Sequence, residues 1–175
     1  MEVRSRSIDF DVIGGVDVYK NERLDPSYDE FAADEAKVVP GLGDYGEPVK
    51  LGAAEEALAK KVMEKEAFNL VASDKISLHR TVPDTRDPQC KAVKYDEELP
   101  SVSVVIIFTN EAWTPLLRTI WSVLDNTPPE YLHEIILVDD FSDKKHLGGK
   151  LERYILKKFP SKVSLAKRTE STHKI

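Results

Sequence analysis

The sequence lacks several features that would identify its class at once. Among its 175 residues there is one cysteine, Cys90, so neither an internal disulfide framework nor a zinc site built from cysteines can form. The longest apolar run, Val104 to Phe108, has the length of a strand, whereas a transmembrane helix needs about 18 apolar residues. The first ten residues contain Arg4 and Arg6 but no apolar stretch, so they do not have the pattern of a secretory signal peptide.

The charge of the chain is slightly acidic and unevenly distributed. The 25 basic and 31 acidic residues give a formal charge of −6, which argues against binding nucleic acid through phosphate neutralisation. Residues 1–36 contain ten acidic and four basic residues and so carry the whole of this charge. The apolar residues of this stretch follow neither a helical nor a strand period, so we predict an acidic flexible tail over residues 1–38. An acidic docking arm is the alternative interpretation.

Residues 39–98 are predicted to form a stem-like segment. A stretch rich in glycine and proline, 40–48, is followed by a helix from about Gly52 to Phe68. Ala72 to Tyr95 is then dense in polar residues, and we expect it to be irregular because Pro83 and Pro88 fix the backbone there. Since such long irregular loops are uncommon in compact domains, we expect this one to wrap around another part of the protein.

Residues 99–175 predict an α/β domain. Their order is strand, helix, strand, helix, strand, which begins a doubly wound, mostly parallel sheet. The first strand is almost continuously apolar, as expected of a strand buried on both faces, and Thr114 and Pro115 suit the start of the first helix. The predicted elements are strands Ser101–Thr109, Glu134–Val138 and Lys162–Ala166, with helices from Thr114 to the Pro128-Pro129 pair and from about His146 to Phe159.

Polar residues follow the first two predicted strands, where ligands bind in such sheets. Thr109, Asn110 and Glu111 come after the first strand, and Asp139 and Asp140 end the second. An acid in that place can accept hydrogen bonds from a ribose or from the N–H edge of a base, or it can bind a metal. Helix capping is an equally ordinary role for it. No glycine-rich fingerprint follows the first strand, which disfavours a dinucleotide site or a P-loop.

Three blocks of the sequence resemble the polypeptide N-acetylgalactosaminyltransferases. They are Phe68 to Lys91 (FNLVASDKISLHRTVPDTRDPQCK), Leu99 to Leu132 (LPSVSVVIIFTNEAWTPLLRTIWSVLDNTPPEYL) and His133 to Asp143 (HEIILVDDFSD). With the PGLGDYGEPVKL stretch, the resemblance covers about Val39 to Lys167. It implies the N-terminal part of a catalytic domain: the first half of a GT-A type sheet, preceded by the stem helix and the acidic tail.

The resemblance also implies an activity and a location. Enzymes of this family are type II membrane proteins of the Golgi that use Mn²⁺ to hold UDP-GalNAc and transfer GalNAc to Ser or Thr of acceptor proteins. This transfer initiates mucin-type O-glycosylation. The first 37 residues contain no membrane anchor, and without one this chain is expected to be cytosolic.

Four residues occupy positions that match the family's nucleotide-sugar site. Asp140 matches the residue that contacts the uridine, and Ile107 matches another nucleotide contact, which as isoleucine is limited to backbone hydrogen bonds. Thr109 stands where many relatives have histidine. Glu111 belongs to the family's Asn-Glu-Ala turn and is expected to orient the pocket.

The sequence departs from the family at its end and at Cys90. It contains no Asp-x-His metal motif, and its four histidines, His79, His133, His146 and His173, show no ligand spacing, so we predict no catalytic or metal-binding residue in this chain. The resemblance implies a disulfide from Cys90 to a cysteine that these 175 residues lack. A buried free thiol is the alternative. We further expect the strand Lys162–Ala166 to lie at a bare sheet edge, which promotes aggregation.

Three hypotheses about function remain. The chain is a partial GalNAc-transferase that retains the nucleotide-binding half and is inactive alone. Alternatively, it is a non-catalytic isoform that binds UDP or regulates a full-length paralogue. The third hypothesis is a truncated product without a folded function.

Overall fold

The computed structural model describes residues 10–13, 29–96 and 98–168. They form two compact units. The sheet unit contains the described residues 10–13, 100–113 and 128–168, and the helical unit contains 29–96, 98–99 and 114–127. No helix among the described residues is long and apolar enough to cross a membrane.

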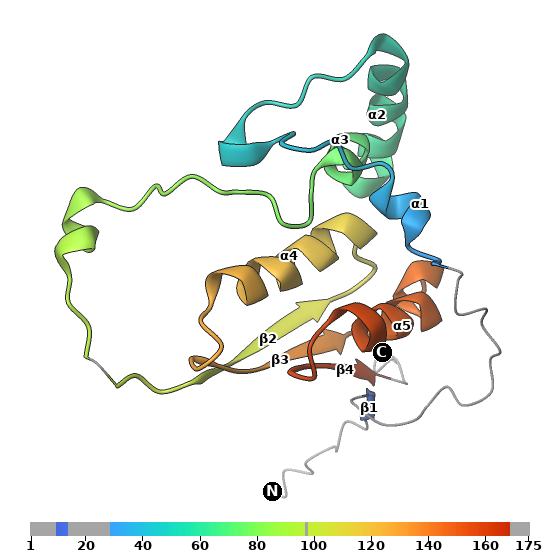
Figure 1. Cartoon of the computed structure of the whole chain (residues 1–175). Coiled ribbons are helices and arrows are strands. Elements are labelled where there is room, and N and C mark those ends of the chain that lie inside the picture. Colours follow the sequence, from blue (N-terminus) through green and yellow to red (C-terminus); the bar gives the residue numbers. More distant parts are fainter. Residues whose placement is uncertain (1–9, 14–28, 97, 169–175) are drawn as a thin grey trace, which may run out of the picture. The chain divides into compact units, whose positions relative to one another are not determined.

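The sheet unit is built around a four-stranded sheet in the order β1-β4-β3-β2 (Figure 1). Strands β2 (Val102–Phe108), β3 (Leu132–Asp139) and β4 (Val163–Arg168) are parallel, as predicted for a sheet of the GT-A type. The chain passes from β3 to β4 through a 3₁₀ turn, Lys145–Leu147, and helix α5, Gly149–Lys158. The mixed α/β class is therefore confirmed.

One face of this sheet forms the core of the sheet unit. Ile135 and Leu137 of β3 and Leu165 of β4 are fully buried, together with Leu151 of α5. Aromatic rings extend this core, since Tyr154 contacts both Trp113 and Phe159 in edge-on geometry with ring centroids 5.4 and 5.2 Å apart. Burial of this apolar surface is the main favourable term for folding the unit.

The prediction that the first strand, β2, is buried on both faces is wrong. β2 lies at the end of the sheet, and on its outer face Val105 and Ile107 are 55% and 70% exposed. A continuous apolar run predicts two covered faces. In the structure, no described strand pairs with the outer edge of β2.

The prediction of a bare edge at the third strand is also wrong. Strand β1 (Phe10–Ile13) pairs with β4 in antiparallel orientation, with Phe10 opposite Arg168 and Ile13 opposite Leu165. The backbone groups at this edge of β4 are therefore covered along four residues. A four-residue strand is too short to give a clear period in a sequence dominated by charge, which explains why the pattern missed it.

The helical unit contains the remaining helices (Figure 1). They are α1 (Ala32–Glu35), α2 (Ala53–Glu66), α3 (Leu70–Lys75) and α4 (Trp113–Asn126), with 3₁₀ turns at Asp44–Gly46 and Pro88–Ala92. The helix predicted from about Gly52 to Phe68 is confirmed as α2, which ends before Ala67, whose φ of 61° lies in the left-handed region. The short helix α3 follows it and was not predicted. Pro88 was expected to keep its surroundings irregular. It instead begins the 3₁₀ turn Pro88–Ala92, because proline suits the first position of a helical turn.

Parts of the predicted acidic tail have regular structure. In addition to β1, helix α1 follows Phe31, whose side chain is only 1% exposed. One buried aromatic residue can anchor a short helix in a sequence whose overall composition suggests disorder. The rest of the predicted tail, residues 1–9 and 14–28, lies outside the described residues.

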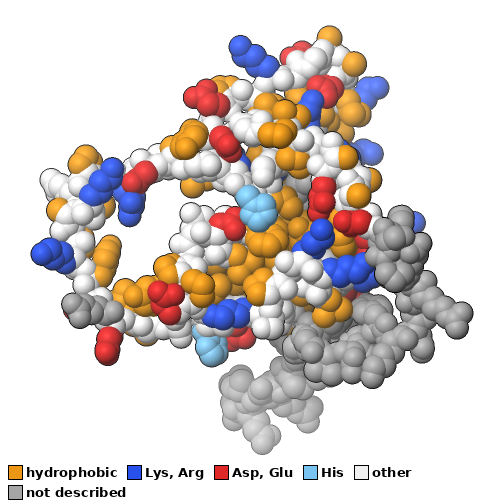
Figure 2. All heavy atoms as spheres, viewed as in Figure 1, with side chains coloured by type: hydrophobic (Ala, Val, Ile, Leu, Met, Phe, Trp, Pro, Cys, Tyr) orange, Lys and Arg blue, Asp and Glu red, His pale blue; other side chains and the backbone are white. Residues whose placement is uncertain are grey.

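Acidic and basic side chains alternate over the face drawn in Figure 2, with apolar side chains between them. This mixed pattern agrees with the near balance of charges after residue 36. Charge is thus distributed over that surface in small groups of both signs.

Candidate functional site

The candidate site lies at the carboxyl edge of the three parallel strands. The register places Phe108 of β2 beside Asp139 of β3, and Asp139 beside Lys167 of β4. The residues that follow, Thr109 and Asp140, therefore come to the same edge as Arg168. Ligands of open α/β sheets bind beyond this edge.

Asp140 is held there by an ion pair with the end of the neighbouring strand. Arg168 Nη1 donates to Asp140 Oδ1 at 2.5 Å, and the arginine side chain is 17% exposed while that of Asp140 is 45% exposed. Oδ2 of Asp140 has no partner among the residues that the structure describes. One carboxylate oxygen is thus fixed in place, and the other remains available to a donor from a ligand.

Two loops at this edge are joined by the side chains of Asn110 and Ser142. The Asn110 backbone N–H donates to Ser142 Oγ at 2.8 Å, and Asn110 Oδ1 accepts from the backbone N–H groups of Asp143 and Lys144 at 2.8 and 3.2 Å. Thr109 Oγ1 donates to the backbone oxygen of Asp140 at 3.1 Å. The loop after β2 therefore fixes the position of the loop after β3.

The backbone at these loops adopts a conformation that L-residues rarely take. Asn110 has a φ of 50° and Phe141 has a φ of 65°. Asparagine tolerates the left-handed region, but for Phe141 it costs roughly 1–2 kcal/mol. Phe141 is 52% exposed, so burial of its ring does little to offset the cost. Strain of this kind is found at functional sites, where the surrounding contacts hold it in place.

The two acids at the end of β3, Asp139 and Asp140, bond different partners and by themselves do not provide a metal site. Asp139 is 5% exposed, and its Oδ1 accepts from the Ser142 backbone N–H at 2.9 Å. Asp140 follows the last residue of β3, and its Oδ1 accepts from Arg168 Nη1. Among the described residues, no group of three or more His, Cys, Asp or Glu side chains could hold a metal ion. Asp139 and Asp140 alone therefore do not fit an octahedral cation, which needs more oxygen ligands.

The other predicted site residues differ in their surroundings. Ile107 lies beside Val138 in the sheet with its side chain 70% exposed. Glu111 uses its carboxylate locally, accepting from the Ala112 backbone N–H at 2.8 Å, while its backbone oxygen accepts from Nε2 of His146 at 2.8 Å. The structure thus brings Thr109 and Asp140 into contact and leaves the carboxylate of Glu111 on its own turn. The nucleotide-binding roles of all four stay predictions.

Sequence reasoning missed the contacts that Ser142, His146 and Arg168 make at this edge. Each acts across 28 to 35 residues of sequence, so no local spacing could have shown the contact. The available signal was the position of Arg168 near the end of a predicted strand parallel to the strand that ends at Asp140.

Cys90 lies on the 3₁₀ turn Pro88–Ala92 and is a free, exposed thiol. The alternative of a buried thiol is therefore wrong. Nearby, Arg86 donates to both carboxylate oxygens of Asp84 at 2.8 and 2.9 Å, which lowers the pKa of Asp84 from its ordinary 3.8 to about 2. The disulfide implied for Cys90 stays a prediction.

The family model and the relatives that match this chain are all glycosyltransferases. Residues 103–174 match the family described as glycosyl transferase family 2. The probable N-acetylgalactosaminyltransferase 7 of Caenorhabditis elegans is 49% identical over 129 residues, which are 73% of this chain and 21% of that protein. Human N-acetylgalactosaminyltransferase 7 is 48% identical over 118 residues, 67% of this chain and 18% of that protein.

A solved structure is similar to the chain as well. The crystal structure of GalNAc-T7 with UDP, GalNAc and Mn²⁺ superposes with a TM-score of 0.71 at 43% sequence identity. The match covers 77% of this chain and 25% of that one. The chain spans about a fifth of the length of the curated relatives it matches.

Proposed function

Because this chain contains a segment of the glycosyl transferase family 2 domain, and its homologues are polypeptide N-acetylgalactosaminyltransferases, we propose that it forms the uridine-binding edge of such an enzyme. The observation that carries the proposal is the Asp140 carboxylate at the carboxyl edge of the sheet, with one oxygen fixed by Arg168 and the other available. Uracil has an N3–H donor, which a fixed carboxylate oxygen can accept.

The activity that we propose for the whole protein is that of its family. It transfers GalNAc from UDP-GalNAc to Ser or Thr of acceptor proteins, with Mn²⁺ at the diphosphate, and it works in the Golgi at the start of mucin-type O-glycosylation. The 175 residues by themselves bind the nucleotide without transferring the sugar. Two features support this inactivity: the sequence contains no Asp-x-His segment, and Asp139 and Asp140 do not converge on one cation site.

One observation favours a second candidate, a UDP-binding module without catalysis that acts with a full-length paralogue. β1 covers the edge of β4, as expected of a sheet that persists without further strands at that side. This candidate shares the nucleotide site with the first and differs in having no transferase activity in any assembly.

The proposal is tested by measuring UDP and CDP binding to the 175-residue chain by isothermal titration calorimetry. Cytosine carries an acceptor at N3, so we expect CDP to bind at least about tenfold more weakly than UDP. Asp140→Asn should abolish most of this discrimination, because an amide can present either a donor or an acceptor. Asp143→Asn is the matched control, since this acid lies three residues away on the same loop.

Equal affinities for UDP and CDP would show that Asp140 does not recognise the base.

Sugar transfer is measured separately, with UDP-GalNAc, Mn²⁺ and a threonine-rich acceptor peptide. We expect no transfer above the blank from the 175 residues alone. Transfer above the blank would contradict the proposed inactivity without affecting the nucleotide site.

A further inference from the structure

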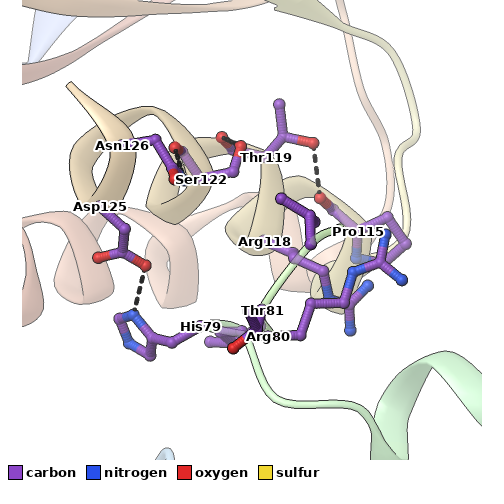
Figure 3. Close-up of a pocket in the computed structure, with 11 residues that line it drawn as sticks. His79, Arg80, Thr81, Pro115, Arg118, Thr119, Ser122, Asp125 and Asn126 are labelled. Atoms are coloured by element: carbon purple, nitrogen blue, oxygen red, sulfur yellow. Dashed lines mark hydrogen bonds and ion pairs between the residues drawn. The ribbon is translucent and has the colours of Figure 1, made fainter. Parts of the chain in front are cut away.

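The helical unit contains a cleft that the proposed function does not use. It has a volume of about 540 Å³ and lies between residues 78–82 and one face of α4 (Figure 3). Arg80 and Arg118 lie at the end of the cleft near Pro115. His79 and Asp125 lie at the other end.

Arg118 forms part of the wall of the cleft through a chain of hydrogen bonds. Its guanidinium donates to the backbone oxygens of Ser73, Ile76 and Ser77 and to Ser73 Oγ, at 2.8 to 3.2 Å. Four of its five N–H groups are used in this way. None of the four goes to a carboxylate, so within the described part of the chain the positive charge of Arg118 has no direct ion pair.

Arg80 adds a second positive charge to the same end of the cleft. It is exposed, and no hydrogen bond or ion pair holds its guanidinium in the part of the chain that the structure describes. Burial and the nearby charge of Arg80 both lower the pKa of Arg118, and Asp74 opposes them only in part. Two positive charges thus lie near each other at this end of the cleft, and among the described residues no carboxylate forms an ion pair with either of them.

The acid inside the cleft does not neutralise this pair. Asp125 Oδ2 lies 2.8 Å from Nδ1 of His79, whose ring rests on Trp121 with centroids 4.4 Å apart. The backbone N–H of Thr81 is taken by Asp44 Oδ1 at 3.0 Å, which leaves the Thr81 hydroxyl as its remaining donor. The hydroxyl of Thr119 donates to the backbone oxygen of Pro115. The charged donors at the Pro115 end are therefore the guanidinium groups of Arg80 and Arg118.

We propose that this cleft is a binding site for an oxyanion, a phosphate or carboxylate group of a ligand, held mainly by Arg80 and supported by Arg118. A guanidinium fork binds such groups through two parallel hydrogen bonds. An anion at this position relieves the repulsion between the two arginines, which gives the site a preference for negative charge. The site is independent of the nucleotide edge, since all its residues belong to the helical unit.

The test uses nuclear magnetic resonance on the 175-residue chain labelled with ¹⁵N. The backbone amides of residues 78–82 and the arginine Nε–H signals are followed during titration with sodium phosphate, and separately with sodium acetate, at ionic strength kept constant with sodium chloride. We expect saturable shifts at Arg80 and Arg118 with one or both probes. Saturation by phosphate alone assigns a phosphate-bearing ligand, and saturation by acetate alone assigns a carboxylate.

Variants of the cleft residues test whether the anion binds in the cleft. Arg80→Gln should weaken the affinity about tenfold or more, and Arg80→Lys should weaken it less, because it keeps the charge but loses the fork. Arg86→Gln is the control, an exposed arginine six residues away whose guanidinium is already paired with Asp84. Shifts that never saturate, or an affinity unchanged in both Arg80 variants, would overturn the proposal.

Discussion

Arg168 and Asp140 form an ion pair, with Nη1 and Oδ1 2.5 Å apart, between the last residue of β4 and the first residue after β3. The same β4 residue lies opposite Phe10 in the pairing with β1. The side chain that fixes the candidate uridine contact is therefore itself carried by a strand paired on both sides. The pairing of β4 with β1 and β3 therefore supports the arginine that positions Asp140 at the candidate site.

The first prediction concerns the energetic coupling between these two residues. Because Asp140 is 45% exposed, we expect the pair to contribute only about 0.5–1 kcal/mol to the free energy of unfolding. A double-mutant cycle with Arg168→Gln and Asp140→Asn, followed by urea denaturation, measures this coupling. The Arg168→Gln variant should also bind UDP more weakly, because the carboxylate is then free to rotate. Effects on stability that add within about 0.3 kcal/mol would mean that the contact contributes nothing.

The second prediction concerns the hydrogen-bond chain that starts at Arg118. Its Nη1 donates to Ser73 Oγ, Ser73 Oγ donates to Thr114 Oγ1, and Thr114 Oγ1 donates to Asp74 Oδ1, at 3.1, 3.0 and 2.9 Å. Arg118→Lys cannot satisfy the three backbone oxygens and the hydroxyl together, so we expect a loss of about 2–4 kcal/mol in the free energy of unfolding.

Urea denaturation followed by circular dichroism measures the effect of Arg118→Lys. Arg86→Lys is the matched control, because that arginine is exposed and bonded only to a neighbouring acid. We expect a change of less than about 0.5 kcal/mol in the control. An equally small change at Arg118 would show that its hydrogen bonds are replaced by water at no net loss.

The third prediction concerns β1 as the cover of the sheet edge. Proline at Asp11 or at Val12 removes a backbone N–H, and alternate residues of an edge strand direct this group toward the neighbouring strand. One of the two variants should therefore lose a hydrogen bond to β4, and amide exchange in Val163–Arg168 should become faster in that variant. Concentration-dependent association, measured by light scattering, should rise with it.

Lys94→Pro serves as the control for this pair, because Lys94 lies in an exposed stretch without regular structure. It should change neither the exchange of the β4 amides nor the association. If both β1 variants behave like this control, the pairing of β1 with β4 does not protect the sheet.

The sequence predicted the parallel strands because long apolar runs ending in polar residues are strong local signals. Val104–Phe108 and Ile135–Val138 located β2 and β3, and the acids after β3 located the carboxyl edge. Contacts over long sequence separations carried no such signal. The pairing of Arg168 with Asp140 and the role of Arg118 depend on residues 28 to 45 positions apart. Thr114 shows the same limit. Its place at the start of α4 is predicted by the sequence, but its hydrogen bond to Asp74, 40 residues away, is not.

The last prediction concerns the pH dependence of the Asp84–Arg86 pair. Hydrogen bonds from the Arg86 side chain, and then from its backbone N–H, lower the pKa of Asp84 to about 2. Since this pKa lies below the ordinary 3.8, the contribution of the pair to stability is fully present above pH 4 and is lost as the pH falls through about 2. A carbon-detected titration of the Asp84 carboxyl should therefore give a midpoint about 2. Arg86→Gln should move the midpoint up toward 3.8, whereas Arg80→Gln should leave it unchanged, and an Asp84 midpoint already at 3.8 would mean that the pair does not persist in solution.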